Sequence, residues 1–477
     1  MELTRSLCLI NGDWVAADSG ETINVTDPAD GALITTVPKM GAAETRRAIE
    51  AAQTAMPAWA AMTGKERAAI LRRWFDLMME HQEELARLLT REQGKSLAEA
   101  RGEIAYAASF IEWFAEEGKR VYGDVIPGHA RDKRIVVLKQ PIGVVAAITP
   151  WNFPAAMITR KIGPALAAGC SAVVKPASET PLSAFALGVL AIEAGVPAGV
   201  LNIVTGKSAE IGGELTGNPL VRKLSFTGST EIGRVLQSQC APTIKKTSME
   251  LGGNAPFIVF DDADVDAAVE GVIVSKFRNS GQTCVCTNRI YAQTGIHDAF
   301  VAKLTERVNK LKVGRGLEDG TQIGPLINEA ALLKVEEHID DARAHGATVT
   351  TGGHRHALGH GFFEPTVMTG VTQAMLVARE ETFGPFAPVI RFETEAEALT
   401  LANDSEFGLA GYFYSRDLSR VWRVAEALEC GMVGINTGLI STEVAPFGGI
   451  KQSGLGREGS KYGIDDYVEI KYLCMSI

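Results

Sequence analysis

Short apolar strands alternate with helix-length segments over most of this chain, and no other feature constrains its fold as strongly. From about residue 135 the β-branched runs are RIVVL, GVVAAIT, SAVVK, VLNIV and KLSF, and Pro, Gly or Ser follows each within a few residues. A second series, from about 256 to 436, contains APFIVF, RIYAQ, TVTTGG, PVIRF, GYFYS and MVGIN. Nearly continuous apolar strands separated by helices indicate parallel sheets covered on both faces. We therefore predict an α/β protein with two such domains.

The region before the first series has a different pattern. Between about 42 and 117, apolar residues such as Ile70, Trp74 and Leu77 recur at three- and four-residue spacing, with Arg, Glu and Gln at exposed positions. This spacing is typical of amphipathic helices, so we predict an all-helical region here. The total of 477 residues is enough for two or three domains with sizeable cores.

The last segment, YGIDDYVEIKYL, is alternating and β-rich, but no helix follows it. It needs a partner strand, which residues 122–141 can supply. Two extended pieces that leave the main domains present an open sheet edge, which another subunit commonly covers. We predict a homo-oligomer. On pattern alone, folding of both pieces back onto their own chain is an equal alternative.

Charge and cysteine content exclude several classes of protein. The formal net charge is −10 and no long basic run occurs, which argues against a nucleic-acid or anionic-membrane partner. The seven cysteines are scattered, as expected for free thiols in a reducing compartment. The first residues lack a secretory signal, and no apolar run approaches a membrane span. We predict a cytoplasmic protein, and the histidine spacing indicates no metal site.

Three familiar patterns fail in their context. GLGREG at 454–459 has the Gly-x-Gly-x-x-Gly spacing but does not follow a buried strand. GKS at 206–208 lacks the first glycine of a phosphate-binding loop, because Leu201 stands in its place. The aspartates of DDADVD, at 261–266, lack the glycine and glutamate of a calcium loop and instead favour the start of a helix.

Cys284, in FRNSGQTCVC, is the strongest chemical signal. It follows a Gly and a Thr just after an apolar helical pattern ends, which places it in a glycine-framed loop before a strand. A thiolate in such a loop is a strong nucleophile when a base or a positive dipole lowers its pKa. A cysteine is more often buried and inert, and that is our interpretation of Cys170, Cys240 and Cys430. Cys286 is either a strand residue or a resolving thiol.

Two polar side chains close apolar strands. Glu250, in MELGGNAP, precedes two glycines that permit a sharp turn, and a partly desolvated carboxylate there has a raised pKa and acts as a general base. Asn152, in TPWNFP, lies at a strand end ahead of a helix, where a fixed amide N–H stabilises an oxyanion. A surface glutamate and a turn-forming asparagine are the simpler alternatives.

Two further segments suit a dinucleotide. KPAS closes a strand with Lys175 and Ser178, and FTGSTEIG passes from a strand through Gly228 to a helix that begins near Ser229. Backbone N–H groups and a helix N-terminus at such a position hold a pyrophosphate. Either segment alone is a weak signal.

Taken in order, the motifs resemble the aldehyde dehydrogenase superfamily over nearly the whole chain. They are TPWNFP, KPAS, FTGSTEIG, MELGGNAP, GQTCVC, EETFGPFAPV and PFGGIKQSGLGREG. Within the superfamily, AAMITRKIGPALAAGC, SKFRNSGQTCVCTNR, GYFYSRD and GREGSKYGIDDYVEIKY are most similar to the succinate-semialdehyde and glutarate-semialdehyde dehydrogenases. The resemblance implies a Rossmann-like cofactor domain (1–121 and 142–252), an α/β catalytic domain (253–450) and a protruding β oligomerisation element (122–141 and 460–477). It also implies a homodimer or homotetramer.

The resemblance further implies a mechanism. Cys284 attacks the aldehyde carbon to give a thiohemiacetal, and the Asn152 side chain and the Cys284 backbone N–H hold its oxyanion. Hydride then passes to the nicotinamide and leaves a thioester. Glu250 activates the water that hydrolyses this thioester and releases the acid.

Cofactor contacts follow from the same resemblance. The residues expected at the cofactor are Trp151, Lys175, Ser178, Gly228, Ser229, Glu381 and Phe383. Members that prefer NAD often carry Glu where this chain has Ser178. Ser178 removes a charge that repels a 2′-phosphate and Lys175 supplies a positive one, so we predict that NADP is accepted and preferred over NAD.

Two arginines indicate the substrate class. Arg160 lies eight residues after Asn152 and Arg278 six before Cys284, so both project toward the thiol and together hold a distal carboxylate. Ser441 and Thr442 add a hydroxyl contact. Each arginine has the alternative of being solvated or ion-paired. Succinate and glutarate semialdehyde differ by one methylene, worth only about 1 to 3 kcal/mol in an apolar pocket, so both remain open.

Two other classes of function are consistent with parts of the pattern. A cysteine-dependent hydrolase or acyltransferase would use Cys284 and Glu250 without redox chemistry, but it leaves the cofactor motifs unexplained. A catalytically silent protein on the same fold has no need of Cys284, Glu250 and Asn152 together. Within the dehydrogenase interpretation, oxidation of Cys284 and Cys286 to a disulfide is a hypothetical switch.

Overall fold

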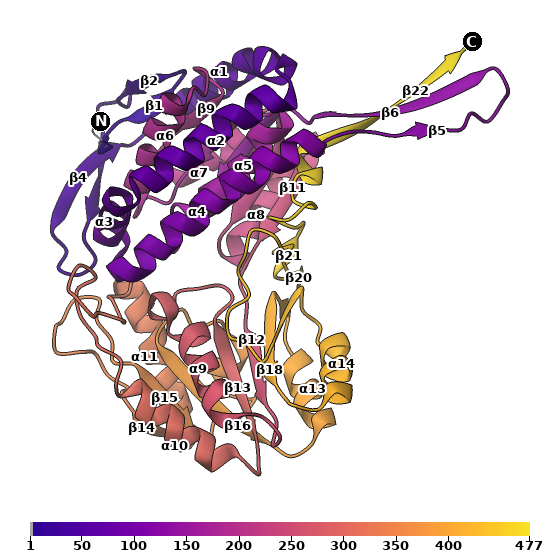
Figure 1. Ribbon diagram of the computed structural model, residues 1–477. Helices are drawn as coiled ribbons and strands as arrows, with labels where there is room; N and C mark the ends of the chain where they lie inside the picture. The colour runs from indigo at the N-terminus through magenta and orange to yellow at the C-terminus, as the bar shows by residue number, and fades with distance from the viewer. Residues whose placement is uncertain (1–2) are drawn as a thin grey trace.

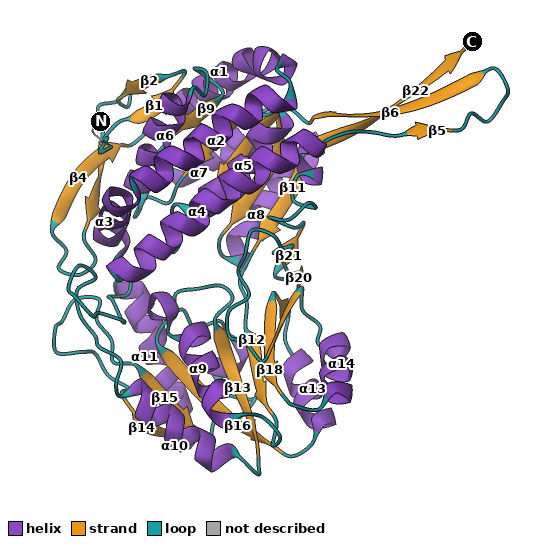
Figure 2. Cartoon of the chain, in the orientation of Figure 1, coloured by secondary structure: helices purple, strands orange, loops and turns teal. Residues whose placement is uncertain are grey.

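The computed structural model describes residues 3–477 and shows two α/β lobes with a long β arm projecting from one of them (Figure 1). The α/β fold class predicted from the sequence is confirmed. Helices pack against the sheet of each lobe, and the C-terminus lies at the end of the arm (Figure 2). Within the described residues, none of the helices is long and apolar enough to cross a membrane.

The first lobe is built on an eight-stranded sheet. In spatial order its strands are β2 (Asp13–Val15), β1 (Cys8–Ile10), β9 (Leu201–Ile203), β8 (Ser171–Lys175), β7 (Val144–Ile148), β10 (Val221–Thr227), β11 (Lys246–Glu250) and β21 (Gly454–Leu455). The five strands from β9 to β11 are parallel. Strands β7 and β8 are buried along their whole length, as expected for a parallel sheet covered on both faces.

Eight helices of the described chain accompany this sheet. They are α1 (Ala42–Ala61), α2 (Gly64–Glu80), α3 (Gln82–Gln93), α4 (Leu97–Glu117), α5 (Ala156–Ala168), α6 (Pro181–Ala194), α7 (Ser208–Gly217) and α8 (Thr230–Cys240), with the short 3₁₀ turns η1 (Gly118–Arg120) and η2 (Ala241–Thr243). Helices α1 to α4 confirm the helical region. Thr63 with Glu66 and Ser96 with Glu99 form capping boxes that fix where α2 and α4 begin.

The second lobe has a seven-stranded sheet. Its strands, in spatial order, are β14 (Thr348–Thr351), β15 (Thr366–Thr369), β16 (Phe386–Phe392), β13 (Thr287–Gln293), β12 (Ala255–Val259), β18 (Ala410–Tyr414) and β19 (Met432–Ile435). Its helices are α9 (Val265–Lys276), α10 (His297–Val308), α11 (Glu329–Ala344), α12 (Leu376–Arg379), α13 (Glu395–Asn403) and α14 (Leu418–Ala427). All strands are parallel except β14, which corrects our assignment of TVTTGG to a parallel strand.

The arm is a three-stranded antiparallel sheet in the order β22-β6-β5. Its strands are β22 (Val468–Ser476), β6 (Lys133–Pro141) and β5 (Val125–Ile126). Residues 122–141 do supply the partner of the terminal strand, as predicted. RIVVL, however, belongs to β6 and not to the parallel sheet. The terminal strand begins only at Val468, because Asp465–Tyr467 forms the 3₁₀ turn η4.

Two small two-stranded sheets were not anticipated. Strands β3 (Thr22–Thr26) and β4 (Leu33–Pro38) pair near the N-terminus, and β17 (Phe407–Gly408) pairs with β20 (Ile450–Lys451) between the lobes. These four strands, like β1 and β2, are short or do not alternate strictly between apolar and polar residues. The periodicity of the sequence therefore gave no signal for them.

The strand order places a crevice in the first lobe. Strand β7 has β8 on one side and β10 on the other. The order in which the chain adds strands to the sheet therefore reverses between β7 and β10. In open α/β sheets, ligands bind at the carboxyl ends of the strands that flank such a switch point. The loops that follow β7 and β10 contain Asn152 and Ser229, which are two of the residues singled out from the sequence.

Candidate active site

An unusual loop presents Cys284. The 3₁₀ turn η3 (Arg278–Gly281) follows α9, and its residues Asn279, Ser280 and Gly281 all have positive φ, at 50°, 56° and 79°. Such backbone strain persists only when neighbouring groups hold it. Glu99 Oε1 accepts a hydrogen bond from the Asn279 amide at 2.7 Å, and the Ser280 hydroxyl donates to Gly324 O at 2.9 Å.

Cys284 lines a cavity of about 310 Å³ between the lobes. The lining consists of Pro150, Trp151, Asn152, Phe153, Met157, Thr227, Gly228, Ser229, Leu251, Gly252, Cys284, Ala331, Lys334, Glu381 and Phe383. Seven residues singled out from the sequence are among them: Trp151, Asn152, Gly228, Ser229, Cys284, Glu381 and Phe383. The structure thus gathers residues from both lobes around one thiol.

Burial raises the pKa of the Cys284 thiol to about 12. The positive charge of Arg160 opposes this rise, whereas the carboxyls of Glu381 and Glu250 add to it. The thiol of the unliganded protein is therefore protonated at neutral pH, and nucleophilic attack requires that its proton be removed.

Asn152 is fixed from both sides. Its side-chain Nδ2 donates to Gln282 O at 3.1 Å, and its backbone carbonyl oxygen accepts from Lys95 Nζ at 2.7 Å. Lys95 is itself paired with Glu103 at 2.6 Å, and both side chains are fully buried. Glu103 Oε1 also accepts the Ala155 amide at the start of α5. A primary amide has two N–H groups, so Asn152 keeps one donor beside the thiol.

Glu250 is buried at the end of β11, and its two carboxyl oxygens have no hydrogen-bond partner among residues 3–477. Burial raises its pKa well above the ordinary value; Glu458 adds to the rise, and Arg160 opposes it. The carboxyl lies beside Gly448, where a Cβ would come within 2.9 Å of Oε1, and Glu250 does not line the 310 Å³ cavity. Its action on a substrate at Cys284 therefore requires a side-chain rotation or an intervening water.

The cavity fits a dinucleotide at the switch point. Ser229 caps α8, its Oγ accepting the Ile232 amide at 3.4 Å, so the helix N-terminus faces the cavity. Gly228 is required by packing within the chain, because a Cβ there would meet the Phe226 ring at 2.5 Å. Glu381 accepts the Gly253 amide at 2.9 Å, and burial raises its pKa to about 8. Trp151 and Phe383 pack edge to face, with ring centroids 6.0 Å apart.

Lys175 and Ser178 lie outside this cavity, at the carboxyl end of β8. Burial lowers the pKa of Lys175, while the neighbouring Glu179 carboxylate opposes the shift. Lys175 Nζ donates to Pro176 O at 3.2 Å, and Ser178 is partly exposed. This position beyond the switch point is where the far end of a dinucleotide would lie.

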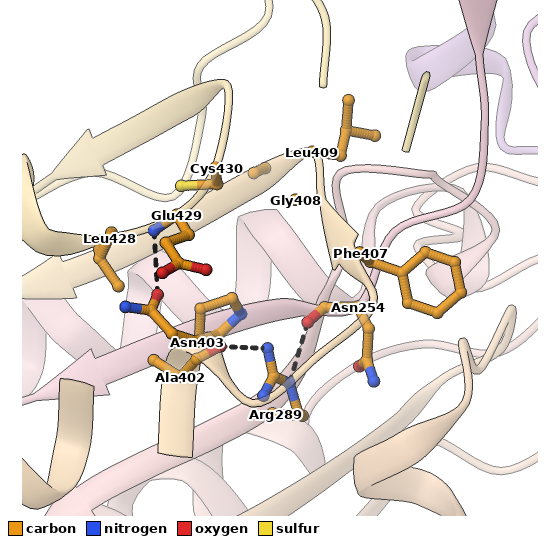
Figure 3. A pocket seen from close by; sticks show the side chains of 12 residues that line it. Asn254, Arg289, Ala402, Asn403, Phe407, Gly408, Leu409, Leu428, Glu429 and Cys430 are labelled. Atoms are coloured by element: carbon orange, nitrogen blue, oxygen red, sulfur yellow. Dashed lines mark hydrogen bonds between the residues drawn. The ribbon is translucent and has the colours of Figure 1, made fainter. Parts of the chain in front are cut away.

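The segment that crosses between the lobes is anchored by Arg289. This arginine is fully buried and donates to Asn254 O at 2.9 Å and to Ala402 O at 2.8 Å (Figure 3). The cavity beside it is about 10 Å³, barely the space of one water molecule. It is a packing gap and not a ligand site. Arg289 therefore fixes the backbone that presents Gly253 to Glu381.

The two arginines have different surroundings. Arg160 is fully buried, its Nε is bound to Glu458, and its guanidinium lies 4.1 Å from the Phe447 ring centroid. Its Nη2 has no hydrogen-bond partner within the described chain. Arg278 is half-buried, lies 5.3 Å from the Phe153 ring centroid, and forms no ion pair with any described residue. The alternative interpretation, that the arginine is held in an ion pair, therefore applies to Arg160 through its Nε but does not apply to Arg278.

The remaining predicted residues do not line the cavity. Ser441 and Thr442 are half-buried, and the Thr442 hydroxyl donates to Glu443 Oε2 at 3.3 Å. Cys286 is buried, and its Sγ lies 3.7 Å from Lys276 O. A disulfide with Cys284 would require Cys286 to leave this contact, and its role as a resolving thiol stays a prediction.

Glu458 is the main residue that the sequence analysis missed. It lies in the GLGREG segment and binds both Arg160 and Lys161 from within the protein. Burial alone would raise its pKa, but these two cations hold it below the ordinary value. Arg160 and Lys161 are adjacent on α5, a helix buried along its whole length. Two cations on a buried helix require a carboxylate to neutralise them. The adjacent Arg160 and Lys161 were therefore the sequence signal for a buried acidic partner.

The fold and the cavity at its switch point are those of a dinucleotide-binding α/β protein, and the sequence comparisons define the family. Residues 14–473 match the aldehyde dehydrogenase family model. The chain belongs to this family.

Individual relatives are similar over their full length. The chain is 69% identical to the glutarate-semialdehyde dehydrogenase of Pseudomonas putida, covering 100% of this chain and 99% of that protein. It is 68% identical to the NADP(+) succinate-semialdehyde dehydrogenase of Escherichia coli, covering 100% and 98%. The crystal structure of succinate-semialdehyde dehydrogenase from Burkholderia pseudomallei is 69% identical, with a TM-score of 0.99 and coverage of 100% and 98%. These similarities give no support to the hydrolase alternative.

Proposed function

We propose that this protein oxidises a semialdehyde with a distal carboxylate, succinate semialdehyde to succinate, with NADP preferred over NAD. Glutarate semialdehyde is the alternative substrate. The single observation that carries the proposal is that one cavity brings together Cys284, Asn152, Ser229 and Glu381, and that Arg278, which forms no ion pair with any described residue, packs against Phe153 of its lining. The names of the similar dehydrogenases support the substrate class, and one of them names NADP(+).

The chemistry begins at Cys284. Its sulfur attacks the aldehyde carbon as the thiol proton passes to water, forming a C–S bond and converting the carbonyl to an oxyanion. The free N–H of Asn152 and the Cys284 backbone N–H hold this oxyanion. Loss of one such donor costs about 3 to 4 kcal/mol of transition-state stabilisation. The product of this step is a thiohemiacetal on Cys284.

When bound, the nicotinamide cofactor supplies the acceptor for the hydride that leaves the thiohemiacetal carbon. The thiohemiacetal is thereby oxidised to a thioester on Cys284. Glu250 then takes a proton from water, the hydroxide adds to the thioester carbon, and the C–S bond breaks. The acid is released and the thiol is restored, so no co-reactant other than water and the dinucleotide is needed.

The residues present fit the dinucleotide. Ser229 and Gly228 would hold the pyrophosphate, and Glu381 the ribose nearest the reacting ring. Trp151 and Phe383 would confine that ring beside the thiol. These roles match the lining of the cavity.

Cofactor preference is tested at Ser178. Changing Ser178→Glu should lower kcat/KM for NADP by roughly ten- to a hundredfold, because a new carboxylate repels the 2′-phosphate, and should leave NAD unchanged or improved. Steady-state kinetics with both cofactors measure this, with Ser178→Ala as the control. A wild-type NADP to NAD ratio of kcat/KM well below one would overturn the assignment.

The distal carboxylate is assigned to Arg278 and Arg160, with Ser441 and Thr442 beside them. Arg278→Met should lower kcat/KM for succinate semialdehyde by roughly thirtyfold to a thousandfold, mainly through KM, since it removes an ion-pairing partner. A neutral aldehyde should be little affected. Arg278→Lys is the matched control that keeps the charge. An equal loss for the neutral aldehyde would contradict the assignment.

Arg160→Met should behave differently from Arg278→Met. It leaves Glu458 buried with one partner fewer, which typically costs about 3 to 5 kcal/mol of folding stability.

We assign residues 1–121 and 142–252 to the cofactor domain, 253–450 to the catalytic domain, and 122–141 with 460–477 to an element that forms a homodimer or homotetramer. The arm exposes large apolar side chains; Val125 is 84% and Ile470 71% exposed. Exposed apolar strands with open edges indicate a subunit contact.

Changing Val125→Asp and Ile470→Asp together should reduce the mass in solution to that of a monomer, as measured by light scattering. The matched control is Leu333→Asp, which changes an exposed leucine on α11. A monomeric wild-type protein would contradict the assembly.

A further inference from the structure

The Tyr106 hydroxyl on α4 and Arg160 Nη2 on α5 are buried and have no well-formed hydrogen bond in the described chain, and the Arg160 guanidinium lies next to the phenol oxygen. The two helices pack against each other. Most buried polar groups in folded proteins are hydrogen-bonded, and each exception needs an explanation such as a catalytic role or a bound water, ion or ligand. An Arg160 N–H beside the phenol oxygen uses that oxygen as an acceptor, which leaves the hydroxyl proton of Tyr106 without an acceptor in the described chain and points to one from outside it.

The surroundings of the Tyr106 hydroxyl favour an anion. Burial raises the pKa of Tyr106, and the positive charges of Arg160 and Arg278 both oppose this rise, so both guanidinium groups are close to the phenol. Glu458 is occupied by Arg160 Nε and by Lys161. Positive charge beside Tyr106 is therefore incompletely neutralised, and a carboxylate is its natural complement.

The aromatic packing places Arg278 beside the catalytic cavity and fixes the Tyr106 ring on α4. Arg278 stacks on Phe153, which lines the same cavity as Cys284. The Tyr106 ring is held by Phe110, with centroids 4.8 Å apart and planes at 66°. The hydroxyl donor therefore has a fixed position, because its ring is held by packing.

We propose that Tyr106 is a specificity-determining residue, whose hydroxyl donates a hydrogen bond to the distal carboxylate of the semialdehyde between Arg160 and Arg278. This inference rests on the proposed function. It adds a neutral donor to the two cations. Because the ring is fixed, the hydroxyl selects substrates by the position of the distal carboxylate as well as by its negative charge.

Tyr106→Phe tests this proposal, because it removes one oxygen and keeps the ring against Phe110. The loss of a hydrogen bond to a charged group should lower kcat/KM for succinate semialdehyde roughly tenfold to a hundredfold, mainly through KM. For butanal, a neutral aldehyde of the same length, kcat/KM should be unchanged or higher. Tyr462→Phe makes the same change at a half-exposed tyrosine and should alter neither value.

The outcomes separate this proposal from the function on which it rests. An equal loss on both aldehydes would assign Tyr106 a structural role, and no loss on the semialdehyde would exclude the contact. Either result overturns the proposal while a wild-type preference for the semialdehyde still stands. If the wild-type enzyme shows no preference for the semialdehyde over butanal, the proposed function fails and this inference fails with it. Thermal unfolding of Tyr106→Phe should remain close to that of wild type.

Discussion

Replacing Cys284 with alanine should lower turnover by at least about 10⁴-fold, because the cavity lining has no second thiol and its one amine, on Lys334, is ion-paired with Glu380. Binding of NADP should persist, since Ser229, Gly228 and Glu381 are untouched. Production of reduced nicotinamide measures turnover, and fluorescence titration measures binding.

Cys430→Ala is the matched control for this change. Cys430 is a free cysteine, and burial raises the pKa of its thiol to about 11, but it does not line the 310 Å³ cavity. Its loss should leave turnover close to that of wild type. Turnover within tenfold of wild type in Cys284→Ala would contradict the assignment of the nucleophile.

Changing Glu250→Gln should separate the two halves of the reaction. Acylation of Cys284 does not consume water, so the first turnover should still produce one reduced nicotinamide per subunit. Hydrolysis of the thioester needs the general base, and steady-state turnover should fall by about 10²- to 10⁴-fold. Stopped-flow absorbance should therefore show a burst followed by a very slow phase.

Glu426→Gln, an exposed position on α14, is the control and should show wild-type turnover. If Glu250→Gln gives neither a burst nor reduced turnover, Glu250 is not the base.

The pH dependence of the slow step should carry the same signature. Burial holds the pKa of Glu250 above its ordinary value, so the carboxyl is protonated, and inactive as a base, at the lower end of the neutral range. Thioester hydrolysis in the wild-type enzyme should accelerate as the pH rises through this range and Glu250 ionises. The residual hydrolysis rate of Glu250→Gln should not show this increase with pH.

Much of the site follows from the sequence because it is built at the ends of buried parallel strands. Apolar runs that end in a polar residue and a glycine give the strand and its loop at once, and parallel strands bring those loops to one edge. Asn152 after β7, Ser229 after β10 and Glu250 at the end of β11 were found in this way. Cys284 was found from its glycine-framed loop.

The residues that support the site were not predictable from local pattern. Lys95 and Glu103 come from the helical region and meet Asn152 only in the folded chain. Glu458 lies about 300 residues from its partner Arg160, in a segment with no periodicity. Local patterns describe the faces of strands and helices, whereas buried ion pairs are specified by which elements pack together.

The central claim is that Cys284 becomes acylated during turnover. Mixing Glu250→Gln with succinate semialdehyde and NADP, followed by rapid acid quench and mass spectrometry of peptides, tests it most directly. The account predicts a mass increase of one succinyl group on the peptide that contains Cys284, and none in the doubly changed Cys284→Ala, Glu250→Gln protein. An unmodified Cys284 while reduced nicotinamide is formed, or an acyl group on another residue, would contradict it.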